Sequence, residues 1–410
     1  MARPRYVCDC PATGRLDYVP GSDAGRLSRD ELLGAAGTGL WRYADLLPIP
    51  ADDPAARTVG ACFPVGGTPL HRAGRVADRL GAGEVWIKNE AANPSGSLKD
   101  RASAVVLAAA LRSGARVIAG ASTGNAAAAT AAVCAAVGFP FVAFLPAHAP
   151  VGRLDELVRY GATVLLVDGD YEAAVRLSLA ACDEWGWFCR TSAVNPYTTQ
   201  GKKTVALEIL DQLGWSVPDV VVAPCGDGNV LVGLHHGFRD ALERGWVDRM
   251  PRLVAVQAAG APAIFLAWAA GATEVAPAPA ATVADGINVS RPLDGTRALA
   301  ALRETGGVAV TVPDEAILAA RDAIAAECGI PAEPSSAASF AALPGLVATG
   351  VIGASDRVVV LNTGAGSRSS GGDTTGVFRV PEDLAAVRAA VGDLAAARLP
   401  DRPSLSPLGI

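Results

Sequence analysis

The sequence of 410 residues lacks long apolar runs and has little lysine. No stretch reaches the roughly 18 consecutive apolar residues that a membrane-spanning helix needs. The first six residues, Met1 to Tyr6, offer no apolar segment of the kind that a signal peptide carries. The eight cysteines are spread along the chain, which does not fit the compact framework of a disulfide-rich secreted domain. These absences favour a reduced, cytoplasmic protein.

The charge balance and the metal-binding residue types argue against two further classes of function. The net charge of −6 and a pI near 5.4 leave no basic excess for a nucleic-acid footprint. The four histidines lack the spacing of metal ligands. Cys8 and Cys10 are separated by one residue, whereas paired zinc ligands are usually separated by about two to four. We therefore expect no metal, no nucleic acid and no membrane.

Short β-rich runs alternate with helical patterns from residue 85 onward, in a chain long enough for two domains. The runs that predict strands are residues 85–88, 117–119, 141–144, 163–167, 220–223, 253–257, 308–312 and 357–361. The patterns that predict helices are residues 124–137, 152–160, 171–184, 202–213, 230–243, 314–328, 335–348 and 381–399. The alternation predicts α/β units around parallel sheets, with right-handed crossovers.

Three glycine-containing loops follow predicted strands, at residues 120–125, 226–228 and 363–366. In open α/β sheets, the loops at the carboxyl ends of the strands line the ligand crevice. We therefore expect the three loops to converge on one cleft, together with Lys99.

Lys99 is the first candidate for a reactive side chain, because it lies where a turn-rich loop gives way to a predicted helix. The chain has four lysines against 31 arginines. A lysine amine can act as a nucleophile, whereas a guanidinium stays protonated and cannot. Taken alone, a lysine in the first turn of a helix is usually a solvated surface group. The surrounding motifs decide between the two interpretations.

The segment from Asn93 to Arg101, Asn-Pro-Ser-Gly-Ser-Leu-Lys-Asp-Arg, closely resembles the lysine motif of the threonine synthases. These are fold-type-II enzymes that use pyridoxal 5′-phosphate (PLP). Six other segments resemble family motifs in the same order, and the resemblance covers residues 39–370. They are Gly39-Leu-Trp-Arg-Tyr43 with Leu46-Leu-Pro48, Gly66-Gly-Thr-Pro-Leu70, Ser122-Thr-Gly-Asn125, Asn195-Pro196 with Gly201-Lys-Lys-Thr204, Gly226-Asp-Gly-Asn-Val-Leu-Val-Gly233, and Leu361-Asn-Thr-Gly-Ala-Gly366.

The resemblance implies a fold like that of the tryptophan synthase β chain, with two doubly wound α/β domains and the cofactor in the cleft between them. We expect a large PLP-binding domain from residues 61–104 and 190–395, and a small domain from residues 105–189. Residues 1–60 would form an extension that packs on the large domain, and residues 396–410 a tail. We also expect a homodimer that takes a small amino acid as its substrate.

The resemblance also implies how the chain would hold PLP. Lys99 would form a Schiff base with the aldehyde and, once released, would move protons on the substrate. Asn125 would bond the phenolic oxygen, and Thr363 would lie beside the pyridine nitrogen. The phosphate would be cradled at a helix N-terminus by Gly226, Asp227, Gly228, Asn229 and Val230.

This loop has a second interpretation, because Gly226 and Gly228 also begin a dinucleotide-binding pattern. Gly233 would have to supply the third glycine, and its spacing is wrong for that pattern. Asp227 is compatible with a bound phosphate only if its carboxylate points away from it.

On the substrate side, the N–H groups of Ser122, Thr123 and Gly124 would hold the carboxylate; a plain helix cap is the alternative. Threonine synthases also bind a phosphate group of the substrate. The candidates for it in this chain are Arg153, Thr198 and Lys202. Thr198 stands where the family has an arginine, and Lys202, where the family has glutamine, restores a positive charge.

The resemblance implies a carbon–oxygen lyase that expels the γ-phosphate of O-phosphohomoserine and adds water at the β-carbon to give threonine. The departures at Ser192, Ala193 and Thr198 leave an alternative open. It is β-replacement or elimination on an activated serine such as O-phosphoserine, or a specialised paralogue that uses another nucleophile. A catalytically inert relative that binds a metabolite is a third possibility, although such a protein would not need Lys99.

Overall fold

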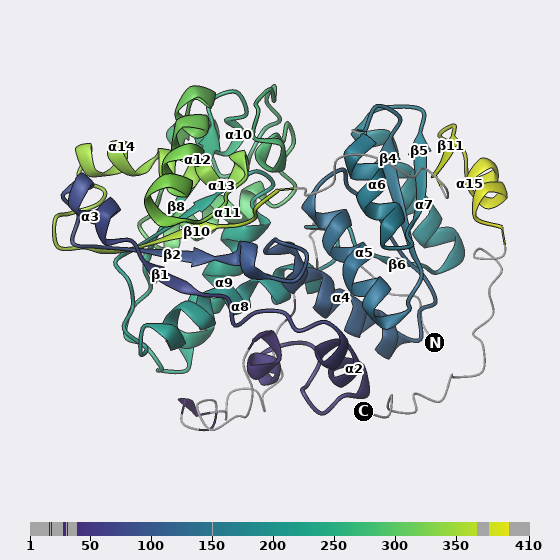
Figure 1. Ribbon diagram of the computed structural model, residues 1–410, viewed down its shortest axis with the longest axis horizontal. Helices are drawn as coiled ribbons and strands as arrows, with labels where there is room; N and C mark the ends of the chain where they lie inside the picture. The colour runs from purple at the N-terminus through teal and green to yellow at the C-terminus, as the bar shows by residue number, and fades with distance from the viewer. Residues whose placement is uncertain are drawn as a thin grey trace.

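Two β-sheets form the framework of the protein in the computed structural model (Figure 1). It describes residues 16, 18, 28, 29, 31, 39–149, 151–366 and 377–392. The six-stranded sheet has the order β1 (Leu70–Arg72), β2 (Glu84–Asn89), β10 (Arg357–Asn362), β7 (Val220–Pro224), β8 (Arg252–Ala258), β9 (Val308–Val312). The five-stranded sheet has the order β11 (Val377–Val380), β5 (Thr163–Val167), β4 (Phe141–Pro146), β3 (Ile118–Ala121), β6 (Phe188–Cys189). The paired strands run parallel, except that β1 is antiparallel to β2.

The six-stranded sheet is covered on both faces, so alternate residues of each strand enter different cores. On β10, Val359 and Leu361 belong to one core, whereas Val358 and Val360 belong to the other. The first face packs against α8 (Tyr197–Gln212), α9 (Asn229–Glu243), α10 (Ala263–Ala269) and α11 (Gly295–Glu304). The second face packs against α3 (Gly74–Leu80), α12 (Asp314–Cys328), α13 (Pro334–Ala341) and α14 (Leu343–Ala348).

The five-stranded sheet follows the same rule. On β4, Ala143 and Leu145 enter one core, whereas Val142 and Phe144 enter the other. The first core includes side chains of α2 (Pro54–Cys62), α4 (Lys99–Ser113), α5 (Asn125–Val137) and α6 (Val151–Arg159). The second includes side chains of α7 (Tyr171–Trp185) and α15 (Leu384–Val391). Figure 1 shows α4 and α8 in the middle of the molecule, between the two sheets.

The predicted α/β architecture with parallel sheets is confirmed. The bounds of β5, β9 and α12 coincide with the predicted ones. Strand β6 was not predicted, because two residues leave no pattern to detect. The helix predicted at residues 335–348 is two helices, α13 and α14, since Pro344 lacks the N–H group that a continuous helix would need.

Two segments pack against elements other than those that the sequence predicts. Strand β11 pairs with β5, and α15 follows it, so residues 377–392 lie with the five-stranded sheet and not with the large domain. The 3₁₀ helix η2 (Leu40–Leu46) contributes Tyr43 to a core of the large sheet and Leu40 to one of the small sheet. The described part of the N-terminal extension therefore packs on both units.

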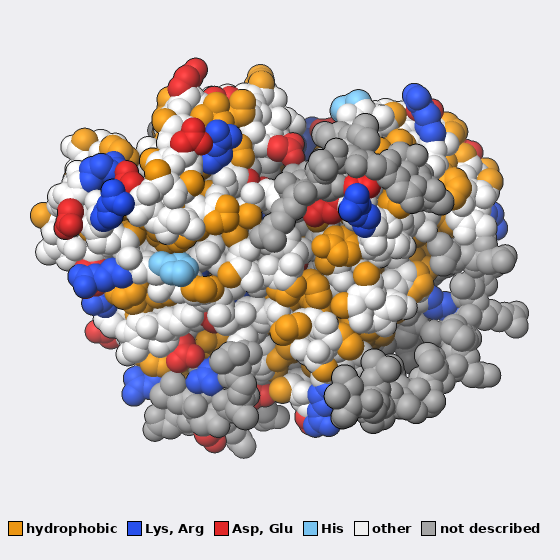
Figure 2. All heavy atoms as spheres, viewed as in Figure 1, with side chains coloured by type: hydrophobic (Ala, Val, Ile, Leu, Met, Phe, Trp, Pro, Cys, Tyr) orange, Lys and Arg blue, Asp and Glu red, His pale blue; other side chains and the backbone are white. Residues whose placement is uncertain are grey.

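On the face that Figure 2 presents, the Lys and Arg side chains of the described residues are interspersed with Asp and Glu. Within the described ranges, no helix combines the length and the apolar character needed to cross a bilayer. The same residues contain no cluster of three or more His, Cys, Asp or Glu side chains that could hold a metal ion. Cys8 and Cys10 lie outside the described residues.

Candidate active site

Lys99 is the first residue of α4, and the loop before it is fastened to the end of β10. The Leu98 N–H donates to the carbonyl oxygen of Thr363 at 2.9 Å. Ser97 forms an isolated β-bridge with Gly364. The Lys99 side chain is half-buried. The lysine and the predicted ring-nitrogen partner therefore lie on neighbouring segments, although they are 264 positions apart in the sequence.

A buried ionic network holds the first turn of α4 in place. Arg101 donates to Glu90 at 2.6 Å and to Glu208 at 2.7 Å, and Lys88 donates to Glu208 at 2.8 Å. All four side chains are at most 4% exposed. Burial opposes ionisation of Glu208, but the charges of Arg101 and Lys88 outweigh it and hold its pKa at about 2. The network fixes Lys99 from a position two residues along the same helix.

Asp100 ties the loop before Lys99 to the helix. Its carboxylate accepts the N–H of Ser95 at 2.7 Å and also the Ser95 hydroxyl. Burial raises the pKa of Asp100 to about 7, and the two bonds from Ser95 only partly offset that effect.

The electrostatic environment favours the unprotonated form of Lys99. Burial lowers its pKa, and the positive charge of Arg190 lowers it further, whereas Glu333 and Asp227 act in the opposite direction. An unprotonated amine is the form that can attack a carbonyl carbon. The arrangement therefore suits the predicted nucleophile.

Asn125 begins α5 and faces Glu333, the residue that precedes α13. The Asn125 amide donates to the two carboxylate oxygens of Glu333 at 2.8 and 3.0 Å. A Cβ atom built on Gly364 would lie 3.1 Å from the Asn125 amide nitrogen and 3.2 Å from a Glu333 oxygen. Asn125, Glu333 and the loop after β10 thus meet at one point beside Lys99.

The loop from Gly226 to Val230 has the close packing of a phosphate cradle. A Cβ atom on Gly226 would lie 2.8 Å from the Cα atom of Ile287, and one on Gly228 would lie 2.8 Å from the carbonyl oxygen of Asp294. Gly228 also has a φ of 94°, which favours glycine. The loop leads into the first turn of α9, whose N–H groups have no acceptors within the helix.

The side chains of Asp227 and Asn229 form hydrogen bonds with residues outside this loop. The Asp227 carboxylate accepts the N–H of Leu293 at 2.6 Å. Asn229 accepts a hydrogen bond from Lys202 and donates to Thr199 at 2.7 Å. An acidic residue is compatible with a phosphate-binding loop only if its carboxylate points away from the phosphate. The bond from the Leu293 N–H gives the Asp227 carboxylate a partner of its own.

The remaining candidates for the site are Thr363 and the segment from Ser122 to Gly124. The Thr363 hydroxyl lies 2.9 Å from the Ser336 hydroxyl. The Gly124 N–H donates to the Ser122 hydroxyl at 3.2 Å, and Thr123 between them is half-buried. This segment enters the N-terminus of α5, which favours an anion.

The described contacts do not gather the three candidates for the substrate phosphate. Arg153 lies on α6, and its side chain is outside the described residues. Thr198 is fully buried and donates its hydroxyl to the carbonyl oxygen of Asn195 at 2.7 Å. Lys202 is buried against Asn229 of the phosphate cradle. Burial lowers the pKa of Lys202, and the charges of Lys99 and Arg190 lower it further.

Glu333 and Arg190 were missed in the sequence. Glu333 precedes a predicted helix, which is a common position for an acidic residue and no signal of a site. Arg190 follows β6, and a polar residue at the carboxyl end of a strand would have been a signal if that strand had been recognised.

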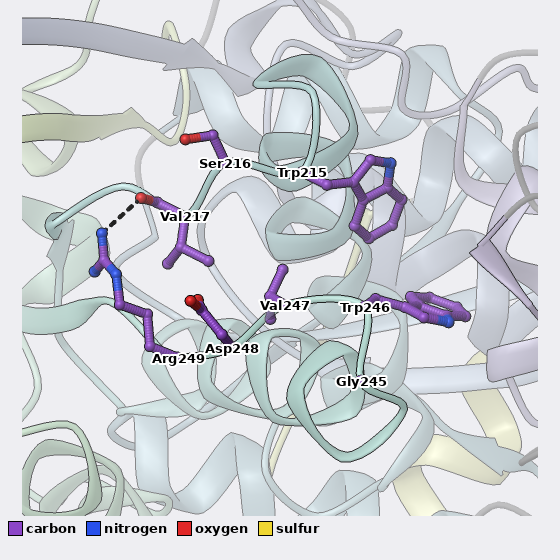
Figure 3. A pocket seen from close by; sticks show the side chains of 8 residues that line it. All are labelled: Trp215, Ser216, Val217, Gly245, Trp246, Val247, Asp248 and Arg249. Carbon is purple, nitrogen blue, oxygen red and sulfur yellow. Dashed lines mark hydrogen bonds between the residues drawn. The ribbon is translucent and has the colours of Figure 1, made fainter.

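A surface pocket lies away from this site, at the other end of α8 and α9 (Figure 3). Its lining residues come from the turns that follow the two helices, and include Trp215, Trp246 and Arg249. Lys202 lies near the start of α8, and the helix rises about 15 Å from there to its last residue, Gln212. The pocket is therefore separate from the residues around Lys99.

Comparison with known proteins agrees with these observations. Residues 62–364 match the family model described as "Pyridoxal-phosphate dependent enzyme". The threonine synthase of Methanosarcina acetivorans is 37% identical over 361 residues, which cover 88% of this chain and 87% of that protein. The threonine synthase of Methanocaldococcus jannaschii is 35% identical over 363 residues, 88% of each chain. A solved structure of maize serine racemase has the same fold, with a TM-score of 0.64 and 22% identity over 77% of this chain and 93% of that one.

The residues present fit PLP. Lys99 offers an amine, the loop from Gly226 to Val230 offers backbone N–H groups where side chains would not fit, and Asn125 and Thr363 offer polar side chains. The chain belongs to the pyridoxal-phosphate dependent enzymes and, among them, to the threonine synthase-like family.

Proposed function

We propose that this enzyme converts O-phosphohomoserine, or an amino acid much like it, to threonine by γ-elimination and β-addition of water. The observation that carries the proposal is the attachment of the loop before Lys99 to Thr363 and Gly364. The bond between Asn125 and Glu333 and the tight packing of the loop from Gly226 to Val230 support it. The threonine synthase names of relatives that match most of the chain support the same reaction.

Bound PLP would supply an electron sink for the substrate's carbon chain. Lys99 would hold the cofactor through its aldehyde carbon and, once free, take the proton from the substrate's α-carbon. The N–H groups from Gly226 to Val230 would hold the cofactor phosphate. Asn125 would donate to the phenolic oxygen, and Thr363 would lie by the ring nitrogen.

The segment from Ser122 to Gly124 would hold the substrate carboxylate at the start of α5. For the substrate phosphate, Arg153 remains the proposed cation, with Lys202 as a second charge. Thr198 would support the phosphate site indirectly, because its hydroxyl already donates to the carbonyl oxygen of Asn195. That engagement leaves this position without a direct phosphate ligand, which keeps the second candidate function open: β-replacement or elimination on an activated serine such as O-phosphoserine, or a paralogue that uses another nucleophile.

The proposal includes a cytoplasmic homodimer in which residues 61–104 and 190–366 form a large domain, and residues 105–189 with 377–392 form a small domain. The six described cysteines are free thiols, which supports a reducing compartment. Light scattering on the purified protein measures the mass in solution, and a mass near 41.5 kDa would exclude the dimer.

The decisive experiment compares two substrates on the enzyme loaded with PLP. O-phosphohomoserine should yield threonine and phosphate at about 1 per second or faster. Turnover of O-phosphoserine in its place would select the second candidate. In the Lys99→Ala variant we expect both reactions to be lost. A wild-type protein that shows no absorbance from bound PLP would overturn the proposal as a whole.

A further inference from the structure

Arg190 is a fully buried cation that none of the proposed catalytic steps uses. It follows β6, and its N–H bonds to the carbonyl oxygen of Ala119 on β3 at 2.8 Å. The side chain is 2% exposed. A Cβ atom on Gly120 would lie 3.2 Å from the Cβ atom of Arg190. Arg190 therefore lies against the end of β3, just before the loop that carries Ser122.

The partners of the guanidinium are neutral hydroxyl groups. Nε donates to Thr130 at 2.8 Å, Nη1 to Ser192 at 2.9 Å, and Nη2 to Ser103 at 3.2 Å. No carboxylate among the described residues lies within ion-pair distance of Arg190. Buried arginines are ordinarily paired with a carboxylate, as Arg101 is in this protein. Arg190 keeps its charge without such a partner.

The contact with Ser103 places this charge next to Lys99. Ser103 follows Lys99 by four positions on α4, and residues four apart lie on the same face of a helix. The guanidinium thus lies about one helical turn from the lysine. In an interior of low dielectric, a charge at that range acts strongly on a neighbouring amine.

We propose that Arg190 is a positioning residue whose unpaired charge keeps the Lys99 amine unprotonated and ready to bond PLP. This rests on the proposed role of Lys99 as the attachment point. Hydroxyl partners fix the guanidinium without neutralising it, as a carboxylate would. The three hydroxyl groups come from α4, α5 and the loop after β6, and they hold the charge at a defined place.

The other charged groups around the pair partly oppose Arg190. Glu333 and Asp227 favour the protonated form of Lys99. Lys202 opposes that form only when its own amine is protonated, and burial and the nearby cations lower the pKa of Lys202. Burial lowers the pKa of Arg190 to about 10, so it remains charged at neutral pH.

Three more groups act on Arg190 itself. Two are Tyr171, whose hydroxyl donates to the carbonyl oxygen of Ala121 at 3.3 Å, and Asp100. Cys189, the residue before Arg190, is the third. An ionised form of any of them would favour the charged guanidinium.

The test measures the rate at which the full-length chain, freed of PLP, bonds added PLP across a range of pH. In this step the Lys99 nitrogen adds to the aldehyde carbon, and a C=N bond replaces the C=O bond. The aldehyde oxygen leaves as water with the two hydrogens of the amine. Absorbance follows the rate, and borohydride reduction with peptide mapping identifies Lys99 as the residue that is bonded.

We expect Arg190→Met to slow the attachment roughly tenfold at neutral pH, because a smaller fraction of the amine is unprotonated. The rates of the variant and the wild type should converge near the pKa of an ordinary lysine, about 10.4. Arg190→Lys keeps the charge and should restore most of the rate at neutral pH.

Three other results separate the possible failures. If Arg190→Met and Arg190→Lys are slowed equally at every pH, Arg190 is a structural clamp and the inference is wrong. If Arg190→Met has the wild-type profile, the charge does not act on Lys99, and the inference is also wrong. If borohydride traps PLP on another residue of the wild type, the proposed role of Lys99 itself fails.

Discussion

The amide of Asn125 donates to both carboxylate oxygens of Glu333, at 2.8 and 3.0 Å, and so joins the two units of the protein across the site. Asn125 begins α5 beside the five-stranded sheet, and Glu333 precedes α13 beside the six-stranded sheet. The same carboxylate opposes the lowering of the Lys99 pKa by burial and by Arg190. Glu333 therefore opposes Arg190 in setting the charge of the lysine.

Glu333→Gln should move the pH profile of PLP attachment in the direction opposite to Arg190→Met. The amide keeps an acceptor for Asn125 but removes the negative charge, so a larger fraction of Lys99 is unprotonated. We expect attachment at neutral pH to be roughly three- to tenfold faster than in the wild type. Glu243→Gln, at the exposed far end of α9, is the matched control and should have the wild-type profile. A slower rate for Glu333→Gln would contradict the assignment.

Arg101→Met should be among the most destabilising single substitutions in the chain. It leaves two buried carboxylates, Glu90 and Glu208, with Lys88 as their remaining cation. Breaking a buried ion pair on one side costs about 3–5 kcal/mol. Urea unfolding of the protein measures the change.

The double variant Arg101→Met with Glu208→Gln should recover part of this loss, since it removes one of the unpaired charges. Arg176→Met removes an exposed pair with Glu382 and should destabilise the protein far less than Arg101→Met. Equal losses for Arg101→Met and Arg176→Met would show that the buried network contributes no more than a surface pair.

Asp100 should make the stability of the wild type fall as the pH rises from about 4 to about 7. Its folded pKa of about 7 lies above the ordinary value, so the folded state binds a proton that the unfolded state has already released. That contribution is full below the ordinary pKa and is lost as the pH passes 7. It amounts to at most about 4 kcal/mol.

Asp100→Asn stays neutral throughout and should remove this part of the pH dependence. The measurement is the difference in unfolding free energy between the variant and the wild type at several pH values. The difference should favour the variant progressively up to pH 7 and then stay constant. The exposed residue Asp322 provides the control for the substitution itself, Asp322→Asn, which should leave the unfolding free energy close to that of the wild type. A flat difference for Asp100→Asn would exclude the raised pKa.

The sequence predicts those parts of the fold that have a local pattern. Strands β5 and β9 are apolar runs bounded by loops, and the site loops after β3, β7 and β10 follow from the rule that ligands bind at the carboxyl ends of parallel strands. Lys99 was identified because its motif is continuous in the sequence.

The features that the sequence does not predict depend on contacts between distant segments. Strand β11 pairs with β5 across more than 200 residues, and no pattern in either strand specifies the partner. Glu333 acquires its place in the site from Asn125, which lies 208 residues earlier. Arg190 is not predicted as a site residue because the strand before it, β6, has two residues, too few for a periodic pattern.

Gly201→Ala tests how closely α8 must approach α4 for the site to form. A Cβ atom at position 201 would lie 2.2 Å from the carbonyl oxygen of Arg101, in the first turn of α4. One of the two helices has to move, at a cost of about 1–3 kcal/mol or more. Gly345→Ala, in α14, meets no atom within 4 Å and should be neutral or stabilising by up to about 1 kcal/mol. Because Lys99 is two residues from Arg101, Gly201→Ala should also weaken PLP attachment, whereas Gly345→Ala should not. Equal stability and equal PLP attachment in the two variants would show that the contact between α8 and α4 does not position Lys99.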